Sequence, residues 1–345
     1  MINTLFVQHR SPHHAKNSGY DRLIDYYHHA KAVSGVSRMP YKLAKVLSSM
    51  VSQKAGLYNS DSVYKELELF GLLKAKNQSI VHYLNAERDV RFAIKYKRLF
   101  NNPIFLGTFH KPASILDWRI QNTAYVNSLN GAIAVGVNQV DYLRERFKIP
   151  HVTYIPHGVD TQFFFPDLTK RKANRLLFVG QHLRDFKALN YCIPRIAEHV
   201  KDLSVQVIIH PGYIDKVVFH KSITILSGLD DVGLRRAYQE ASVLFLPMLD
   251  STACNSILEA MACGLPVVTN AVGGNMEYLK DTDSFLMPIL EYDGLIEEVK
   301  RLLSDTLSLE RLSRLGREKA LNYDWEEVSS QVLKFHKSLL LEQGI

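Results

Sequence analysis

Residues 247–275 read PMLDSTACNSILEAMACGLPVVTNAVGGN and predict a strand, a loop and a helix in succession. A buried strand ends at Pro247, and a loop of small polar residues follows it. Asn255 or Ser256 suits the N-cap of a short helix over residues 257–263. A loop that leads from a strand into a helix start is a ready site for an anion, because free N–H groups and the helix dipole point at the ligand.

The rest of this stretch adds a carboxylate and a second strand. Glu259 lies about one turn inside the helix, where a carboxylate can accept hydrogen bonds from vicinal hydroxyls such as those of a ribose. Gly264 is a helix stop, and Pro266 opens the next strand. A tight turn over residues 272–275 follows near the same sheet edge.

Short apolar runs alternate with amphipathic stretches along most of the chain, which predicts a doubly wound α/β fold. The alternation breaks over residues 156–172, where we place a domain boundary because each side is long enough for one Rossmann-like sheet. The expected strands are Thr4–Gln8, Ser79–Leu84, Ile104–Thr108, Gly131–Val135, Val152–Ile155, Arg175–Val179, Val205–Ile209, Ile223–Leu226, Val243–Pro247 and Pro266–Thr269.

The stretch around Glu259 resembles the signature of retaining glycosyltransferases of GT-B fold, specifically glycosyltransferase family 4. There, two Glu separated by seven residues precede Ala-Met-Ala-x-Gly-x-Pro-Val-Val, and Glu259 corresponds to the second of them. Ser251 stands where the first is expected, and Asp250 precedes it. Asp250 either replaces the missing carboxylate or caps the loop. Residues 253–255, Ala-Cys-Asn, resemble a variant loop of the family.

Other segments extend the resemblance over nearly the whole chain. Residues 177–187, LFVGQHLRDFK, resemble the segment that grips the donor diphosphate, with Gly180 in the loop and Arg184 and Lys187 as the cations. Both cations are expected in the loop after a strand. The resemblance implies three catalytic residues, His110, Arg184 and Lys187. It implies donor contacts from Ser18, Gly19, Gly180, Ser227, Leu229, Asp250, Asn255, Ser256 and Glu259.

The resemblance also implies the architecture: two Rossmann-like domains that face each other across a cleft. The first is residues 1–160, an acceptor domain. The second is residues 161–325, which binds the nucleotide-sugar donor. Tyr323-Asp324-Trp325 resembles the family's end motif, after which a C-terminal helix, residues 326–345, crosses back to the first domain. Residues 155–160, IPHGVD, resemble the linker between the domains.

The implied activity is transfer of a hexose from a UDP- or GDP-sugar to an acceptor hydroxyl, with retention of anomeric configuration and without a metal or other cofactor. Two alternatives stay open: a nucleotide-sugar epimerase of the same fold, and a non-catalytic subunit that binds a sugar nucleotide or a glycan. The second is motivated by Ser251 in place of Glu. The donor base and sugar, the acceptor, the linkage and the oligomeric state are not readable from the residues.

Composition bounds the partners and the location. The chain has 345 residues, of which 46% are hydrophobic and 22% charged, as in a globular protein of about two domains. It lacks a signal peptide, and its three cysteines form no disulfide framework, so we expect a cytoplasmic protein. The net charge is +7. Residues 1–165 hold 21 Lys and Arg against 11 Asp and Glu.

This basic first half is compatible with nucleic acid, an anionic membrane or an anionic substrate, and equally with a solvated surface. A nucleotide-sugar site argues against nucleic acid. The expected partners are therefore the donor, an anionic or lipid-linked acceptor, and the inner face of a membrane in peripheral contact with the first half. The acceptor itself is expected to be a glycan, a glycolipid or a small molecule.

Overall fold

Two compact units make up the part of the chain that the computed structural model describes, which is residues 3–8, 17, 19–27, 30–36, 39–50, 54–74 and 79–342. The first unit takes the described residues of 1–14, 19–157 and 325–345, and the second takes those of 15–18 and 158–324. Each unit alternates strands and helices, so the predicted α/β class is confirmed.

The first unit is built on six strands. They are β1 (Asn3–Val7), β2 (Ala30–Val33), β3 (Ser79–Tyr83), β4 (Ile104–Phe109), β5 (Gly131–Ala134) and β6 (His151–Tyr154). Its α-helices are α1 (Tyr41–Met50), α2 (Ser60–Leu73), α3 (Ala86–Asp89), α4 (Phe92–Lys95), α5 (Ala113–Arg119), α6 (Val140–Phe147) and α13 (Trp325–Leu341). Its 3-10 helices are η1 (Tyr20–Tyr26), η2 (Lys97–Leu99), η3 (Val126–Ser128) and η4 (Val137–Gln139).

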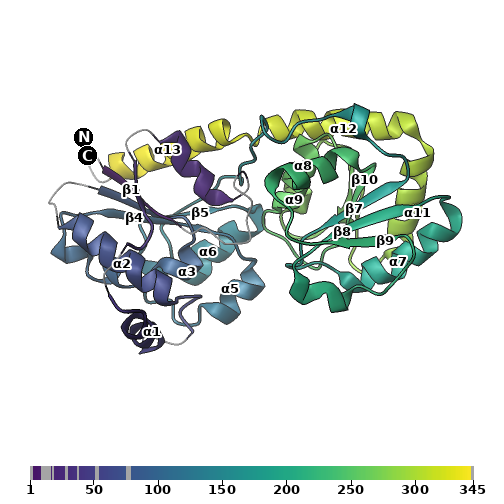
Figure 1. The fold of residues 1–345 in the computed structure, drawn as a ribbon. Helices are drawn as coiled ribbons and strands as arrows, with labels where there is room; N and C mark the ends of the chain where they lie inside the picture. Colours follow the sequence, from purple (N-terminus) through teal and green to yellow (C-terminus); the bar gives the residue numbers. More distant parts are fainter. Residues whose placement is uncertain are drawn as a thin grey trace. The chain divides into compact units, whose positions relative to one another are not determined.

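These strands form one parallel sheet in the order β2-β1-β3-β4-β5-β6. Every residue of β3, β4 and β5 is buried, as expected for a parallel sheet covered on both faces. Figure 1 shows α13 along one face of this sheet and α2, α3 and α5 beyond the other. A Cβ built on Gly131 would lie 3.0 Å from the side chains of Phe335 and Leu339, so α13 packs closely on β5.

The second unit contains β7 (Arg175–Val179), β8 (Ser204–Ile208), β9 (Ile223–Leu226), β10 (Val243–Leu246), β11 (Val267–Asn270) and β12 (Leu286–Met287). Its α-helices are α7 (Phe186–His199), α8 (Asp231–Glu240), α9 (Asn255–Ala262), α10 (Asn275–Tyr278), α11 (Tyr292–Ser304) and α12 (Thr306–Leu321). Its 3-10 helices are η5 (Leu168–Lys170) and η6 (Pro211–Lys216).

This second sheet is also parallel, in the order β12-β11-β10-β7-β8-β9 (Figure 1). Among the helices of this unit, α12 and α8 pack against α9, and α11 packs against α7. The core is dominated by strand residues and by the apolar faces of these helices, with Phe178, Phe245 and Tyr238 fully buried.

The ten expected strands agree with observed ones to within about one residue at each end, and β2 and the two-residue β12 are not among those ten. The four residues of β2, Ala-Lys-Ala-Val, carry little β-propensity of their own, and pairing with β1 makes them a strand. The C-terminal helix predicted over residues 326–345 is observed as α13, which begins at Trp325 and ends at Leu341. Within the described ranges, the structure contains no helix that is both long and apolar enough to cross a bilayer.

Candidate functional site

The strand order of the second sheet reverses between β7 and β10. From β7 the chain passes to β8 on one side, whereas β10 lies on the other side. The loops that leave the carboxyl ends of β7 and β10 therefore border a crevice, the place where open α/β sheets bind ligands. Two hydrogen bonds join these loops: Asp185 N–H donates to the Pro247 carbonyl and Leu249 N–H to the Leu183 carbonyl, both at 2.9 Å.

Helix α9 starts at this crevice. Its N-cap is Cys254, which supplies no side-chain hydrogen bond, so the predicted N-cap at Asn255 or Ser256 is wrong. Those two residues instead are the first two of the helix, where N–H groups have no carbonyl four residues earlier within the helix to donate to. The helix ends as predicted at Gly264, with φ +62°. There Gly264 N–H donates to Met261 and Leu265 N–H to Ala260, at 2.9 and 2.8 Å.

Arg184 lies against the first turn of α9. Its guanidinium donates to the Val179 carbonyl at 2.9 Å and to the His182 carbonyl at 3.0 Å, which hold it at the end of β7. The same group reaches Cys254 Sγ and Ser256 Oγ, each at 3.3 Å. A fixed cation beside the positive end of a helix provides the electrostatics and the donors that a phosphate requires.

Gly180 lets the guanidinium come this close. Its φ is +84°, and an added Cβ would lie 3.1 Å from the terminal nitrogen Nη2 of Arg184. Lys187 is placed differently from the prediction: it is the second residue of α7 rather than a loop residue, and it is exposed. Arg184 and Lys187 nevertheless line one cavity of about 470 Å³, together with Asp185, Phe186, Asn190, Lys216, Leu249, Leu290 and Tyr292.

Glu259 is buried in the second turn of α9. Its Oε2 accepts a hydrogen bond of 2.8 Å from the Tyr238 hydroxyl, which is fully buried on α8. Burial first, and the neighbouring Glu259 carboxylate second, raise the pKa of Tyr238 well above its usual value, so Tyr238 remains a donor. The partner role of Tyr238 was not predicted, because hydrogen bonds between helices carry no local sequence signal.

The loop after β10 packs against the Gly273-Gly274 turn by direct backbone contact. A Cβ on Gly273 would lie 1.8 Å from the Ser251 carbonyl oxygen, and one on Gly274 would lie 1.8 Å from that of Thr252. The predicted tight turn thus has a packing reason for both glycines. Asp250 Oδ1 accepts a 2.7 Å hydrogen bond from Ser251 N–H, a loop-capping contact.

The remaining donor residues of the second unit lie at the same sheet edge, after β9. Ser227 donates its hydroxyl to the Ile209 carbonyl at 2.7 Å, and Leu229 is 37% exposed. Both belong to the loop that leads into α8, and β9 stands two strands away from β7. Gly180, Arg184 and Ser256 therefore lie close together in the structure. Ser227 and Leu229 lie further along the same sheet edge.

In the first unit, His110 follows β4 and is held on two sides. Its N–H donates to Glu87 Oε1 at 3.1 Å, and its ring Nε2 lies 2.7 Å from the Leu84 carbonyl. The Tyr20 ring meets the imidazole edge to face at 4.9 Å. Because a carbonyl only accepts, Nε2 carries a proton, and in the neutral ring Nδ1 is then the acceptor.

Glu87, which accepts the hydrogen bond from the His110 N–H, was not among the predicted site residues. It is 1% exposed, and burial raises the pKa of its carboxyl to about 7, against the lowering effects of its backbone hydrogen bonds and of Lys111. Its position three residues after the end of the predicted strand Ser79–Leu84 was a usable signal. Gly19, the N-cap of η1, has φ +128°, and Ser18 lies outside the described residues.

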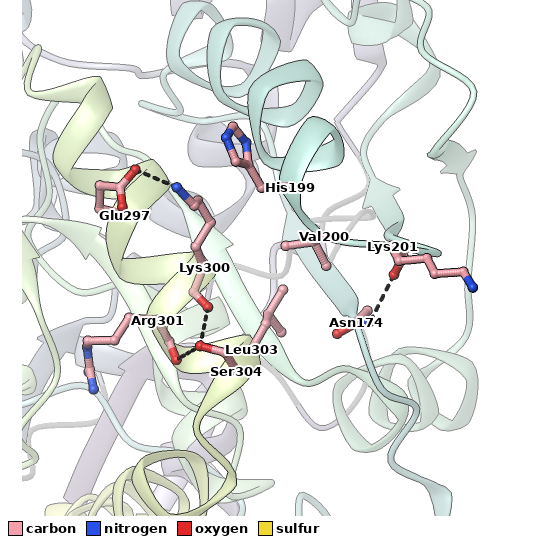
Figure 2. Close-up of a pocket in the computed structure, with 9 residues that line it drawn as sticks. All are labelled: Asn174, His199, Val200, Lys201, Glu297, Lys300, Arg301, Leu303 and Ser304. Carbon is pink, nitrogen blue, oxygen red and sulfur yellow. Dashed lines mark hydrogen bonds and ion pairs between the residues drawn. The ribbon is translucent and has the colours of Figure 1, made fainter.

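A further hollow of about 510 Å³ lies at the opposite edge of the second sheet (Figure 2). Asn174 and Lys201 precede β7 and β8, so this hollow is at the amino ends of the strands. Lys300 pairs with Glu297 at 2.8 Å, and the amide of Asn174 donates to the Lys201 carbonyl at 2.9 Å. These four residues are thus engaged in two pairs, away from the crevice.

Comparison with known proteins finds similarity to glycosyltransferases. Residues 173–305 match the family described as glycosyl transferases group 1. Over 324 residues the chain is 23% identical to an uncharacterized glycosyltransferase of Methanocaldococcus jannaschii, covering 90% of this chain and 72% of that protein. It is 26% identical to a phosphatidyl-myo-inositol mannosyltransferase of Mycobacterium leprae over 201 residues, 54% of this chain and 53% of that one. The match thus spans about half the length of the mycobacterial enzyme.

Solved structures show the fold. A sucrose-phosphate synthase from Thermosynechococcus elongatus matches with a TM-score of 0.75 at 16% identity, over 99% of this chain and all of that one. Anabaena HepE, solved with UDP and glucose, matches with a TM-score of 0.68 at 13% identity, over 98% of this chain and all of that one. The fold is GT-B, as the resemblance implied.

Proposed function

We propose that this chain, whose residues 173–305 match the family described as glycosyl transferases group 1, moves a hexose from a nucleotide diphosphate sugar to an acceptor hydroxyl with retention of anomeric configuration. The observation that carries the proposal is Arg184, held against the first turn of α9 where the strand order of the second sheet reverses. A diphosphate suits that place because it needs both a cation and free N–H groups.

The chemical task is to stabilise the leaving group. As the bond to the sugar breaks, negative charge gathers on the diphosphate. Arg184, Lys187 and the N–H groups of Asn255 and Ser256 would offset this charge from fixed positions, which costs little reorganisation during the reaction. We therefore propose a reaction that uses these protein groups and needs no metal ion.

The other predicted residues would orient the donor. Glu259 would accept hydrogen bonds from the ribose, with Tyr238 fixing the carboxylate through Oε2. The loop with Ser227 and Leu229 would face the base, and Asp250 would contact the sugar. Ser18 and Gly19 would approach the diphosphate by their backbone. His110 would accept a hydrogen bond from a sugar hydroxyl through Nδ1.

We propose a UDP- or GDP-sugar as the donor. Support for UDP comes from Anabaena HepE, solved with UDP-glucose and matching at a TM-score of 0.67. The acceptor would be a glycan, a glycolipid or a small molecule. The mycobacterial relatives, named phosphatidyl-myo-inositol mannosyltransferases, favour a lipid-linked acceptor, and a membrane contact of the basic first half is consistent with one.

The test is release of nucleoside diphosphate from a panel of UDP- and GDP-sugars, with and without candidate acceptors. We expect release by the wild type and a loss of at least about tenfold in Arg184→Gln and Glu259→Gln, since each removes a charged hydrogen-bonding group. Circular dichroism on the same samples verifies that both variants are folded.

A second candidate, a non-catalytic binding subunit, has one observation in its favour, Ser251 at the position of the first expected carboxylate. Binding of a nucleotide sugar without any release of nucleoside diphosphate would establish that candidate instead. Appearance of a free epimerised sugar without an acceptor would point to the epimerase.

A further inference from the structure

Helix α1 exposes a stripe of large apolar side chains. Of its ten residues only Ala44 is buried, and α1 packs against α2. Leu43, Val46 and Met50 are 48%, 52% and 76% exposed. Their spacing of three and four residues places them on one side of the helix, whereas Ala44 lies on another. This apolar stripe, Leu43, Val46 and Met50, thus faces away from the unit that carries it.

The surrounding sequence is basic throughout. Residues 26–60 contain Lys31, Arg38, Lys42, Lys45 and Lys54 and not one Asp or Glu. This segment alone supplies five positive charges in a chain whose net charge is +7. Lys42 and Lys45 are exposed on α1, each one residue before a member of the apolar stripe. Their long side chains can bring the ammonium groups to the level of the stripe's border.

Of the three acidic residues of the neighbouring helix α2, only Asp61 is exposed. On α2, Glu66 is buried, and Glu68 accepts hydrogen bonds from the N–H groups of Gly35 and Val36 at 2.8 and 3.1 Å. Glu68 is thereby held at the backbone that precedes α1. The outward side of α1 therefore combines apolar side chains with two exposed lysines, and α1 itself carries no carboxylate.

The area of the stripe decides between a protein and a bilayer as its partner. A stable protein interface buries about 800 Å² on each partner, far more than three side chains offer. A bilayer surface needs less: a shallow apolar face enters the border of the acyl chains while lysines meet anionic headgroups. We propose that α1 docks on an anionic phospholipid bilayer, with the apolar stripe inserted and Lys42 and Lys45 at the headgroups. This inference deepens the proposed function, because it names the surface that would bring the enzyme to a lipid-linked acceptor.

The experiment is flotation of the full chain with vesicles of phosphatidylcholine alone and of phosphatidylcholine mixed with phosphatidylglycerol. We expect the wild type to float with the anionic vesicles only, and less of it at high salt. Lys42→Gln/Lys45→Gln should weaken partitioning about 30-fold, at about one kcal/mol for each lysine near an anionic surface. Leu43→Gln/Val46→Gln/Met50→Gln should weaken it at least about tenfold by removing the inserted face.

Matched controls lie on the second unit. Lys221→Gln/Lys280→Gln removes the same charge from exposed positions, and Leu307→Gln/Leu321→Gln removes side chains that are 78% and 46% exposed. Both controls should float like the wild type. Equal flotation of the stripe variant and the wild type, or no flotation with anionic vesicles, would overturn the proposal. Self-association that depends on the stripe would overturn it too, in favour of a protein partner.

The outcome is separable from that of the proposed function. Binding of a nucleotide sugar in the absence of lipid does not involve α1, so the α1 variants should keep the wild-type affinity for the donor. Loss of vesicle binding with intact donor binding, as in these variants, isolates the docking surface. If the wild type bound no nucleotide sugar, the proposed function would be contradicted, whereas the docking of α1 would still be decided by flotation.

Discussion

Arg184 is the residue on which the proposed diphosphate site depends most. Its guanidinium is aligned by two backbone carbonyls of its own loop and by Ser256 of α9. The sequence predicted the residue and its loop but not these partners. They depend on how the loops after β7 and β10 meet, and that pairing is a long-range event.

Replacing Arg184 tests its role in binding. Arg184→Gln should weaken the affinity for UDP or GDP about tenfold to a hundredfold, because a hydrogen bond to a charged group contributes about 1.5–3 kcal/mol. Calorimetric titration measures this. Arg195→Gln, which removes an exposed arginine of α7, should leave the affinity unchanged. Equal affinities of the wild type and Arg184→Gln would contradict the assignment.

Gly274 tests the close approach of the two loops behind the crevice. Its φ of −75° is open to any residue, so Gly274→Ala is unfavourable only through its collision with the Thr252 carbonyl. We expect a loss of about 2–4 kcal/mol in the free energy of unfolding, measured with urea. The control is Gly71→Ala in α2, where nothing lies within 4 Å of the new Cβ, and it should stabilise slightly. A similar small effect in both variants would show that the loops separate easily.

Glu87 gives the first unit a pH dependence near neutrality. Because burial raises the pKa of its carboxyl to about 7, the folded state favours the protonated form, and stability falls as the pH rises from about 4.5 through 7. Relative to Glu87→Gln, the wild type should lose up to about 3 kcal/mol of unfolding free energy over that range. Urea titrations at a series of pH values measure this. If the unfolding free energies of the wild type and Glu87→Gln changed with pH in the same way, a raised pKa at Glu87 would be excluded.

At the scale of elements, the strands were the most predictable part of the chain. Their buried apolar runs are local signals, as in β7 and β9, which the sequence delimited correctly. The start of α9 was misplaced because N-cap preference favours Asn and Ser over Cys. Here Ser256 pairs with Arg184 instead of capping, and a site interaction thus replaces a local rule. Helix α1 was not predicted, since its outward apolar stripe does not mark a core-facing side.

Helix α13 is joined to the first sheet by buried histidines. His336 Nε2 lies 3.2 Å from His82 Nδ1, and His82 Nε2 lies 2.8 Å from Thr108 Oγ1. Burial lowers the pKa of His336 to about 3 and also lowers that of His82. Both rings are therefore neutral in the folded unit.

This predicts acid sensitivity that originates at α13. A lowered folded-state pKa means that stability is present above about pH 6.5 and declines as the pH falls, because the unfolded chain takes up the proton. Between pH 6.5 and 5 the decline should be about 2 kcal/mol smaller in His336→Phe than in the wild type, measured by urea unfolding. His199→Phe, at an exposed position, should leave the decline unchanged. If the unfolding free energy of His336→Phe declined as much as that of the wild type over this pH range, the assignment would be refuted.

At the scale of the whole molecule, the two halves of the chain differ in charge. The predicted catalytic and donor-binding residues other than Ser18, Gly19 and His110 come from residues 166–345, which hold 21 Lys and Arg against 24 Asp and Glu. The excess of cations falls in residues 1–165, and half of that excess falls in residues 26–60 around α1. The composition revealed this asymmetry of charge, whereas the exposure of the apolar stripe on α1 is visible only in the structure.

Binding of nucleotide sugars to the wild-type chain tests the central claim most directly. The melting temperature is measured with a panel of UDP- and GDP-sugars, in the wild type and in Arg184→Gln. The account predicts that at least one nucleotide sugar raises the wild-type melting temperature by about 5 °C or more at a hundredfold excess over its Kd, and that the shift shrinks in Arg184→Gln. A wild-type melting temperature that no nucleotide sugar changes would contradict it.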